Sequence, residues 1–157
     1  MPGRKVTVWA GRSSESRADT PFVNEGTGAN QLPFILVPIA LAQPGETILL
    51  SEPEAHLHPK AQCELTRMLL TVAKKENIQF FIETHSEHVL HVILNAIGRG
   101  DLGKDDVALH YFENVEGTAQ VKRLGINEHG QVDGGLPGFF DQSLAELTEF
   151  LDALKKT

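Results

Sequence analysis

A strand–helix–strand unit in the middle of the chain constrains the fold more than any other feature of the sequence. Residues 47–50 form a short apolar run with β-branched side chains, residues 60–75 carry apolar side chains at helical spacing, and residues 78–82 form a second strand-like run. Strands joined by so long a connection pair in parallel, with a right-handed crossover. The sequence therefore predicts an α/β fold with a parallel sheet.

Polar side chains follow both of these strands. Ser51-Glu52-Pro53-Glu54 follows the first strand, and Glu83-Thr84-His85-Ser86 follows the second. Ligands of open parallel sheets bind at the carboxyl ends of the strands, so we expect Glu52 and His85 to face one crevice. A carboxylate and an imidazole there can serve as a general base and as a phosphate or water contact. The alternative is that both are loop residues bonded to the backbone.

A glycine-bearing segment precedes the most apolar stretch of the chain. Residues 32–42 are apolar on all sides, and their length favours a helix with Pro33 in its first turn and a kink at Pro38. The turn at residues 24–31 contains Gly26-Thr27-Gly28, which would present backbone N–H groups to an anion at the positive end of that helix. The alternative for this glycine pattern is a simple turn.

The remaining elements are predicted from alternation, turn residues and caps. Ser143 is a candidate N-cap of a last helix, and Glu146 completes a capping box. The other predicted elements are a strand at 4–9, a helix at 86–97, and two strands at 107–113 and 118–125 that are joined as a hairpin by residues 114–117.

Composition narrows the class of protein. The 157 residues carry a net charge of −7, which argues against a general coating of nucleic acid or anionic membrane. The longest apolar run, 32–42, is too short for a membrane span and contains two prolines. A lone cysteine, Cys63, excludes an intrachain disulfide, fits a reducing compartment and is read as a core or surface thiol. We expect a cytoplasmic, globular protein.

Three segments, in this order, resemble the distal half of an ABC-type ATPase head of the SMC/OLD-like, AAA kind. GTGANQL at 26–32 resembles the signature motif, TILLSEPEAHLHP at 47–59 the Walker B strand with its D-loop, and IETHSEHVL at 82–90 the switch-histidine segment. GFFD at 138–141 resembles the end of a small C-terminal domain in one branch of these ATPases. The resemblance implies a P-loop-NTPase-like core over 1–104 and a small α+β C-terminal domain over 105–157.

The resemblance assigns a role to each matching residue. Glu52 takes the place of the glutamate that polarises the attacking water, and His85 that of the histidine that senses the γ-phosphate. Thr27 and Gly28 fall where signature residues reach the nucleotide of a dimer partner. Leu57, His58 and Pro59 fall in the D-loop, which crosses the same interface.

Two departures from the family pattern bear on activity. Ser51 stands where an acid normally helps to hold hydrated Mg²⁺, and a hydroxyl lacks the negative charge that a hard cation prefers. No GxxxxGKS or GxxxxGKT sequence occurs in the 157 residues, so no P-loop lysine is present for the phosphates. We therefore expect use of ATP and Mg²⁺ only after a P-loop-bearing segment or chain completes the site.

The resemblance further implies a homo- or heterodimer of heads. It leaves a DNA or nuclease partner open, because relatives act in DNA repair, chromosome maintenance or phage defence. A second hypothesis is a degenerate, non-catalytic module that regulates a complete ATPase. A third is a metal-dependent hydrolase, although no cysteines cluster with the histidines and HExxH is absent. The histidines concerned are His56, His58, His85, His88 and His91.

Overall fold

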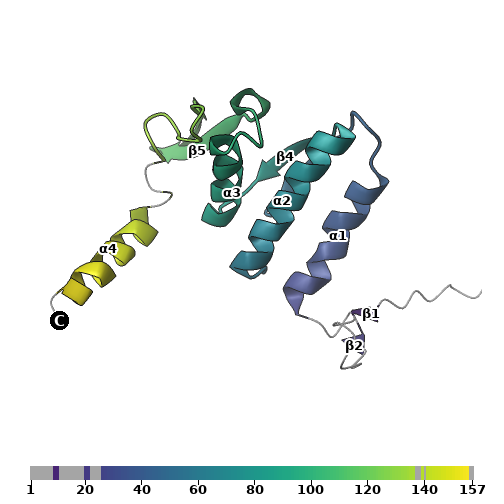
Figure 1. Cartoon of the computed structure of the whole chain (residues 1–157), viewed down its shortest axis with the longest axis horizontal. Coiled ribbons are helices and arrows are strands. Elements are labelled where there is room, and N and C mark those ends of the chain that lie inside the picture. Colours follow the sequence, from purple (N-terminus) through teal and green to yellow (C-terminus); the bar gives the residue numbers. More distant parts are fainter. Residues whose placement is uncertain (1–8, 11–19, 22–25, 137–138, 140, 156–157) are drawn as a thin grey trace, which may run out of the picture. The chain divides into compact units, whose positions relative to one another are not determined.

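The chain divides into two compact units, residues 1–85 and residues 86–157 (Figure 1). The computed structural model describes residues 9–10, 20–21, 26–136, 139 and 141–155. The predicted strand at 4–9 therefore falls largely outside the described residues, and its last residue, Trp9, begins a described strand. That strand, β1 (Trp9–Ala10), pairs antiparallel with β2 (Thr20–Pro21).

A parallel strand pair organises the first unit. Strand β3 (Thr47–Ser51) runs parallel to β4 (Gln79–Glu83), and helix α2 (Pro59–Glu76) connects them (Figure 1). Helix α1 (Thr27–Leu41) precedes β3. The predicted α/β class with a parallel sheet is therefore confirmed, and the positions of β3, α2 and β4 agree with the sequence pattern to within one or two residues.

The core of this unit lies on one face of the two-stranded sheet. Every second strand residue points toward α1 and α2, as the two-residue period of a strand requires. Buried side chains from the two helices form the centre of the cluster, and the inward strand side chains pack against it. The helix members are Ile35, Ile39, Leu65 and Leu69, and the strand members are Ile48, Leu50, Phe80 and Ile82.

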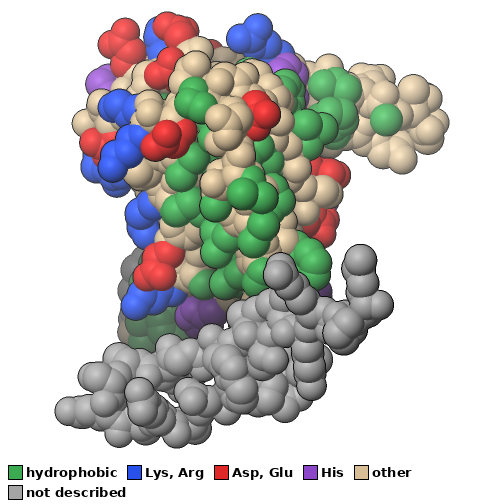
Figure 2. All heavy atoms as spheres, turned by 90° about the vertical axis from the view of Figure 1, so that its right-hand side faces the viewer, with side chains coloured by type: hydrophobic (Ala, Val, Ile, Leu, Met, Phe, Trp, Pro, Cys, Tyr) green, Lys and Arg blue, Asp and Glu red, His purple; other side chains and the backbone are tan. Residues whose placement is uncertain are grey.

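The other face of the sheet is open. Leu49 and Phe81 are direct cross-strand partners on this face, and they are 77% and 58% exposed. Helix α1 also exposes Phe34, Val37 and Leu41 on its outer side. Figure 2, which views the molecule from the side of α1, shows hydrophobic side chains gathered in a band on the outer side of this helix. Parallel sheets are normally covered on both faces, so, within the described residues, the sheet face that carries Leu49 and Phe81 is an uncovered apolar surface.

Helix α1 begins earlier than the sequence predicts. The N–H groups of Ala29 and Asn30 both bind the carbonyl oxygen of Gly26, so the expected turn is already the first turn of the helix. Gly26 is the N-cap, and Pro33 lies inside the helix rather than in its first turn. The prediction of a turn over 24–31 was wrong for residues 27–31, because backbone bonding to one carbonyl overrode the turn signal of the glycines.

The second unit contains helix α3 (Glu87–Gly98), the hairpin strands β5 (Leu109–Val115) and β6 (Thr118–Leu124), and helix α4 (Asp141–Lys155). The hairpin is confirmed, but its turn is only Glu116-Gly117, and both residues have positive φ, as tight hairpin turns require. Helix α4 starts at Asp141, so Ser143 is not its N-cap. An acidic residue is favourable in the first turn of a helix, which makes the earlier start acceptable.

Two further features of the sequence, the GFFD segment and the length of the apolar runs, can be compared with the described residues only. Two of the four GFFD positions, Gly138 and Phe140, lie outside the described residues. Among the helices that the structure does describe, none combines the length and apolar character that a membrane span needs.

The second residue of helix α1 provides a test of this packing. A Cβ atom on Gly28 would lie inside van der Waals contact of the His56 carbonyl oxygen and 3.1 Å from Leu57 Cδ2, whereas a Cβ on Gly26 would meet nothing within 4 Å. Helix propensity alone favours Gly28→Ala by up to about 1 kcal/mol. We expect Gly28→Ala instead to lower the free energy of unfolding by about 1–3 kcal/mol, because the backbone must move.

Denaturant unfolding of the two alanine variants measures this difference. Gly26→Ala is the matched control, and it should cost less, up to about 1 kcal/mol, because alanine is a poorer N-cap than glycine but its Cβ meets nothing within 4 Å. A Gly28→Ala chain as stable as the parent would contradict the close approach of α1 to the loop at 52–58.

Candidate functional site

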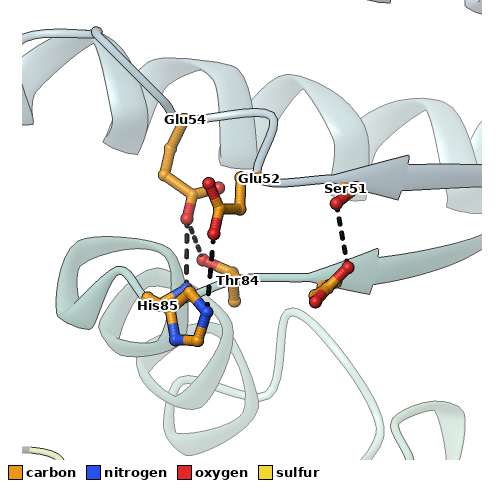
Figure 3. A network of polar contacts seen from close by, with 6 residues as sticks. Ser51, Glu52, Glu54, Thr84 and His85 are labelled. Carbon is orange, nitrogen blue, oxygen red and sulfur yellow. Dashed lines mark hydrogen bonds and ion pairs between the residues drawn. The ribbon is translucent and has the colours of Figure 1, made fainter.

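The register of the parallel pair brings the two polar strand ends together. Ser51 is the direct partner of Glu83, and the Glu52 N–H extends the pairing by donating to the Glu83 carbonyl oxygen at 2.8 Å. The segments that follow the two strands therefore start side by side (Figure 3). Their polar side chains form one network, to which Ser51, Glu52 and Glu54 contribute from one segment and Thr84 and His85 from the other.

Glu52 and His85 face each other in this network. His85 Nε2 lies 3.4 Å from Glu52 Oε1. A dashed line marks this contact in Figure 3. The His85 side chain is 80% exposed and the Glu52 side chain is 51% exposed. Both side chains are therefore accessible to solvent and to a ligand. Glu52 has a φ of 44°, an unusual conformation for a residue other than glycine. Such conformations persist only where the surroundings hold them, and they gather at functional sites.

Ser51 and Glu83 form a second pair beside the first. The Ser51 hydroxyl lies 2.8 Å from Glu83 Oε2, with both residues exposed on the open face of the sheet. A carboxylate is thus present next to the hydroxyl, although it comes from the neighbouring strand. The sequence interpretation gave Glu83 no role, because a cross-strand neighbour can be identified only once the register of the sheet is known.

Glu54 is the functional candidate that the sequence interpretation missed. Its side chain is buried, with only 6% of the residue exposed, and its Oε1 accepts hydrogen bonds from the Thr84 hydroxyl and from the His85 N–H. The sequence shows two acids in one loop but does not distinguish the exposed Glu52 from the buried Glu54. The only available signal was the unusual density of acids and histidines between two structural elements.

The signature-like segment lies against the same loop. Gly28 approaches the His56 carbonyl so closely that no side chain fits there, and Gln31 Nε2 donates to the Glu52 carbonyl oxygen at 3.4 Å. Thr27 is the first residue of α1, where helical N–H groups have no partner within the helix. The structure thus places residues 26–31 beside the 52–58 loop within one chain.

His58 has a structural contact of its own. Its Nδ1 accepts a hydrogen bond from the Lys60 N–H at 3.3 Å, which makes His58 the N-cap of α2, with Pro59 at the first helical position. The loop is further tied down by Gln62, whose amide donates to the Leu57 carbonyl oxygen at 2.9 Å. Within the described part of the chain, no group of three or more His, Cys, Asp or Glu side chains is arranged to hold a metal ion by itself.

Comparisons with known proteins show which family and which fold the chain resembles. A family model described as an AAA ATPase domain matches residues 6–90, and one described as a protein of unknown function (DUF3696) matches residues 102–150. A solved structure from work on ATP-driven dimerization and DNA-stimulated activation of SMC ATPases is similar in fold, with a TM-score of 0.56 at 12% identity. The similarity covers 96% of this chain and 73% of that one. No curated protein matches the chain.

The first family model includes every residue of the network in Figure 3, and the similar solved structure independently has the fold of an SMC ATPase head. The motifs at 26–32, 47–59 and 82–90 lie within the same matched segment. Since that segment spans more than half of the 157 residues, the chain belongs to the AAA ATPase domain family.

Proposed function

We propose that this chain is the distal part of an ABC-type ATPase head, which binds and hydrolyses ATP once a P-loop-bearing segment or chain completes it. The observation that carries the proposal is the pairing of Glu52 with His85 at 3.4 Å, at the ends of adjacent parallel strands in an AAA ATPase domain. Strand ends of this kind are where open parallel sheets bind their ligands.

Glu52 and His85 divide the chemistry between them in this proposal. The Glu52 carboxylate orients and polarises the water that attacks the γ-phosphate, and the His85 imidazole contacts that phosphate. Both side chains are exposed, so a nucleotide and a water molecule can reach them. Phosphoryl transfer depends mainly on positioning and charge stabilisation, which a fixed carboxylate and a fixed imidazole supply.

The open face of the sheet supports the need for a completing segment. No P-loop motif occurs in the sequence, and Leu49 and Phe81 lie uncovered on the face that also carries Ser51 and Glu83. A segment that covers these apolar side chains would end close to the polar strand ends. In our proposal this segment brings the P-loop, with its lysine and backbone N–H groups for the β- and γ-phosphates.

Mg²⁺ fits the oxygen donors at these strand ends. Magnesium in nucleotide sites takes one or two protein oxygens and completes its shell with water and phosphate. The Ser51 hydroxyl and the Glu83 carboxylate, 2.8 Å apart, are hard donors of that kind. We assign Ser51 to a metal-bound water and Glu83 to the negative charge that Ser51 lacks. When bound, the ion neutralises developing phosphate charge.

We also propose a dimer of heads, based on the remaining site residues. Thr27 and Gly28 are the first two residues of α1, Gly28 lies against His56, and His58 is in the same loop as His56. In this proposal these residues contact the nucleotide of a second head, identical or different. The similar solved structure comes from work on ATP-driven dimerization, which is consistent with such a pairing.

The domain assignment remains as the sequence indicates. We propose an ATPase part over 1–104 and a small C-terminal domain over 105–157. The second family model, at 102–150, lies almost wholly within that C-terminal part. A cytoplasmic location fits the lone Cys63.

One alternative is favoured by specific observations. Ser51 in place of an acid and the lack of a P-loop motif are both typical of a degenerate module that regulates a complete ATPase. Under this alternative, the chain binds a partner through its open apolar face and contributes no catalytic carboxylate.

Glu52→Gln distinguishes the proposed ATPase function from the regulatory alternative. In an assembly completed by a P-loop segment, we expect this variant to lose about 10²–10⁴-fold in kcat, because an amide cannot polarise water as a carboxylate does. ATP binding should stay within a few-fold of the parent. Phosphate release and ATP titration measure the two quantities. Glu64→Gln, which removes an exposed carboxylate on α2, is the control. Unchanged turnover in Glu52→Gln would favour the regulatory alternative.

Moving the carboxylate from position 83 to position 51 tests the assignment of Glu83. We expect Glu83→Gln to raise the Mg²⁺ concentration for half-maximal ATP binding about ten-fold, because Ser51 alone offers no charge to the hydrated ion. Ser51→Asp combined with Glu83→Gln should restore the parent value, since the carboxylate returns on the neighbouring strand. Titration of ATP binding against Mg²⁺ measures the effect. An Mg²⁺ dependence that Glu83→Gln leaves unchanged would remove Glu83 from this role.

A further inference from the structure

The buried carboxylate of Glu54 is the least expected feature of the site. An ionised carboxylate is costly to remove from water, and it is retained inside a protein only where bonds or function compensate. Glu54 Oε1 has two donors, but Oε2 has no hydrogen-bond partner among the described residues. An apolar side chain would fill this place at lower cost to folding. A buried polar group with an unsatisfied atom therefore indicates a functional requirement.

The two bonds of Glu54 go to consecutive residues of the switch segment. The Thr84 hydroxyl and the His85 N–H both donate to Oε1, so one carboxylate oxygen fixes the chain where it leaves β4 (Figure 3). Glu54 is itself held on its own side, because the Leu57 N–H donates to its carbonyl oxygen at 3.0 Å. The carboxylate thus joins the 52–58 loop to the backbone of His85.

The relative strength of the contacts shows which of them positions His85. The contact between the His85 ring and Glu52 is largely exposed, and exposed pairs of this kind contribute little. Hydrogen bonds that a buried carboxylate oxygen accepts contribute more, because leaving their donors unpaired would be costly. The ring pair therefore does not hold the imidazole in place by itself. The contacts that Glu54 makes with the backbone behind the ring are the stronger constraint.

We propose that Glu54 is a positioning residue for His85, which holds the imidazole opposite Glu52 and makes its position depend on the 52–58 loop. Because that loop also contacts Gly28, a displacement of the loop is passed to His85 through one buried carboxylate. The catalytic meaning of this link rests on the proposed function, whereas the link itself is a property of the chain alone.

The link is tested on the 157-residue chain without any partner. We expect Glu54→Leu to increase the amide hydrogen exchange of His85 about ten-fold or more and to shift the ring proton signals of His85 in NMR spectra, because both bonds are lost. Glu54→Gln keeps an oxygen acceptor at the same place and should stay within about three-fold of the parent in the same measurement. Glu64→Gln, on the exposed face of α2, should change neither signal.

A milder variant covers the case in which Glu54→Leu does not fold. Thr84→Val removes only the hydroxyl donor, so it should fold with a modestly lower thermal midpoint and give a smaller rise in His85 exchange. If folded Glu54→Leu, or folded Thr84→Val, leaves His85 exchange and ring signals unchanged, the positioning role is overturned.

Turnover in a completed assembly separates this inference from the proposed function. We expect Glu54→Leu to lower kcat about ten-fold with little change in ATP affinity, and Glu54→Gln to restore most of it, since positioning acts on the transition state more than on binding. An altered His85 position with an unchanged kcat would overturn the catalytic part of the inference. An assembly of parent chains that never hydrolyses ATP would overturn the proposed function, while the exchange result still decides the link.

Discussion

The in-register pairing of β3 with β4 is the constraint on which the rest of the structure depends. Because Ser51 is opposite Glu83, both strands end at the same level, and the loops that follow begin with their polar side chains in contact. If the register of either strand shifted by one residue, that strand would turn over, and its apolar side chains would move from the core to the open face. The core cluster around Leu69, against which Leu57 of the 52–58 loop also packs, therefore helps to determine the geometry of the site.

Burial and exposure are divided sharply across this site. Glu54 lies inside and bonds to backbone and hydroxyl donors, whereas Glu52, two residues earlier, is exposed and faces an imidazole. The positive φ of Glu52 makes this possible, because it redirects the chain directly after β3. Two identical side chains thus have different surroundings, one bonded inside the loop and one exposed at the surface, where our proposal places the ligand.

The sequence predicted the parts of the fold that depend on repeating patterns. The α/β class, helix α2 and the hairpin follow from periodicity and turn residues, and all were confirmed. The start of α1 was missed because Gly26 and Gly28 signal a turn, while their helical bonding and the close approach of His56 depend on tertiary contacts. The pairing of Glu52 with His85 was expected from strand ends. The roles of Glu54 and Glu83 were not, since burial and cross-strand neighbours have no local signature.

The open face of the sheet has a consequence beyond chemistry. Within the described residues, β3 and β4 pair only with each other, and the exposed Leu49 and Phe81 lie between their free backbone edges. Free strand edges beside apolar side chains are templates for self-association and are readily attacked when a chain opens. A copy that finds no complement is thus exposed to aggregation and proteolysis. If a segment completes the sheet as we propose, it would then control how much of this protein survives in a cell, as well as what it does there.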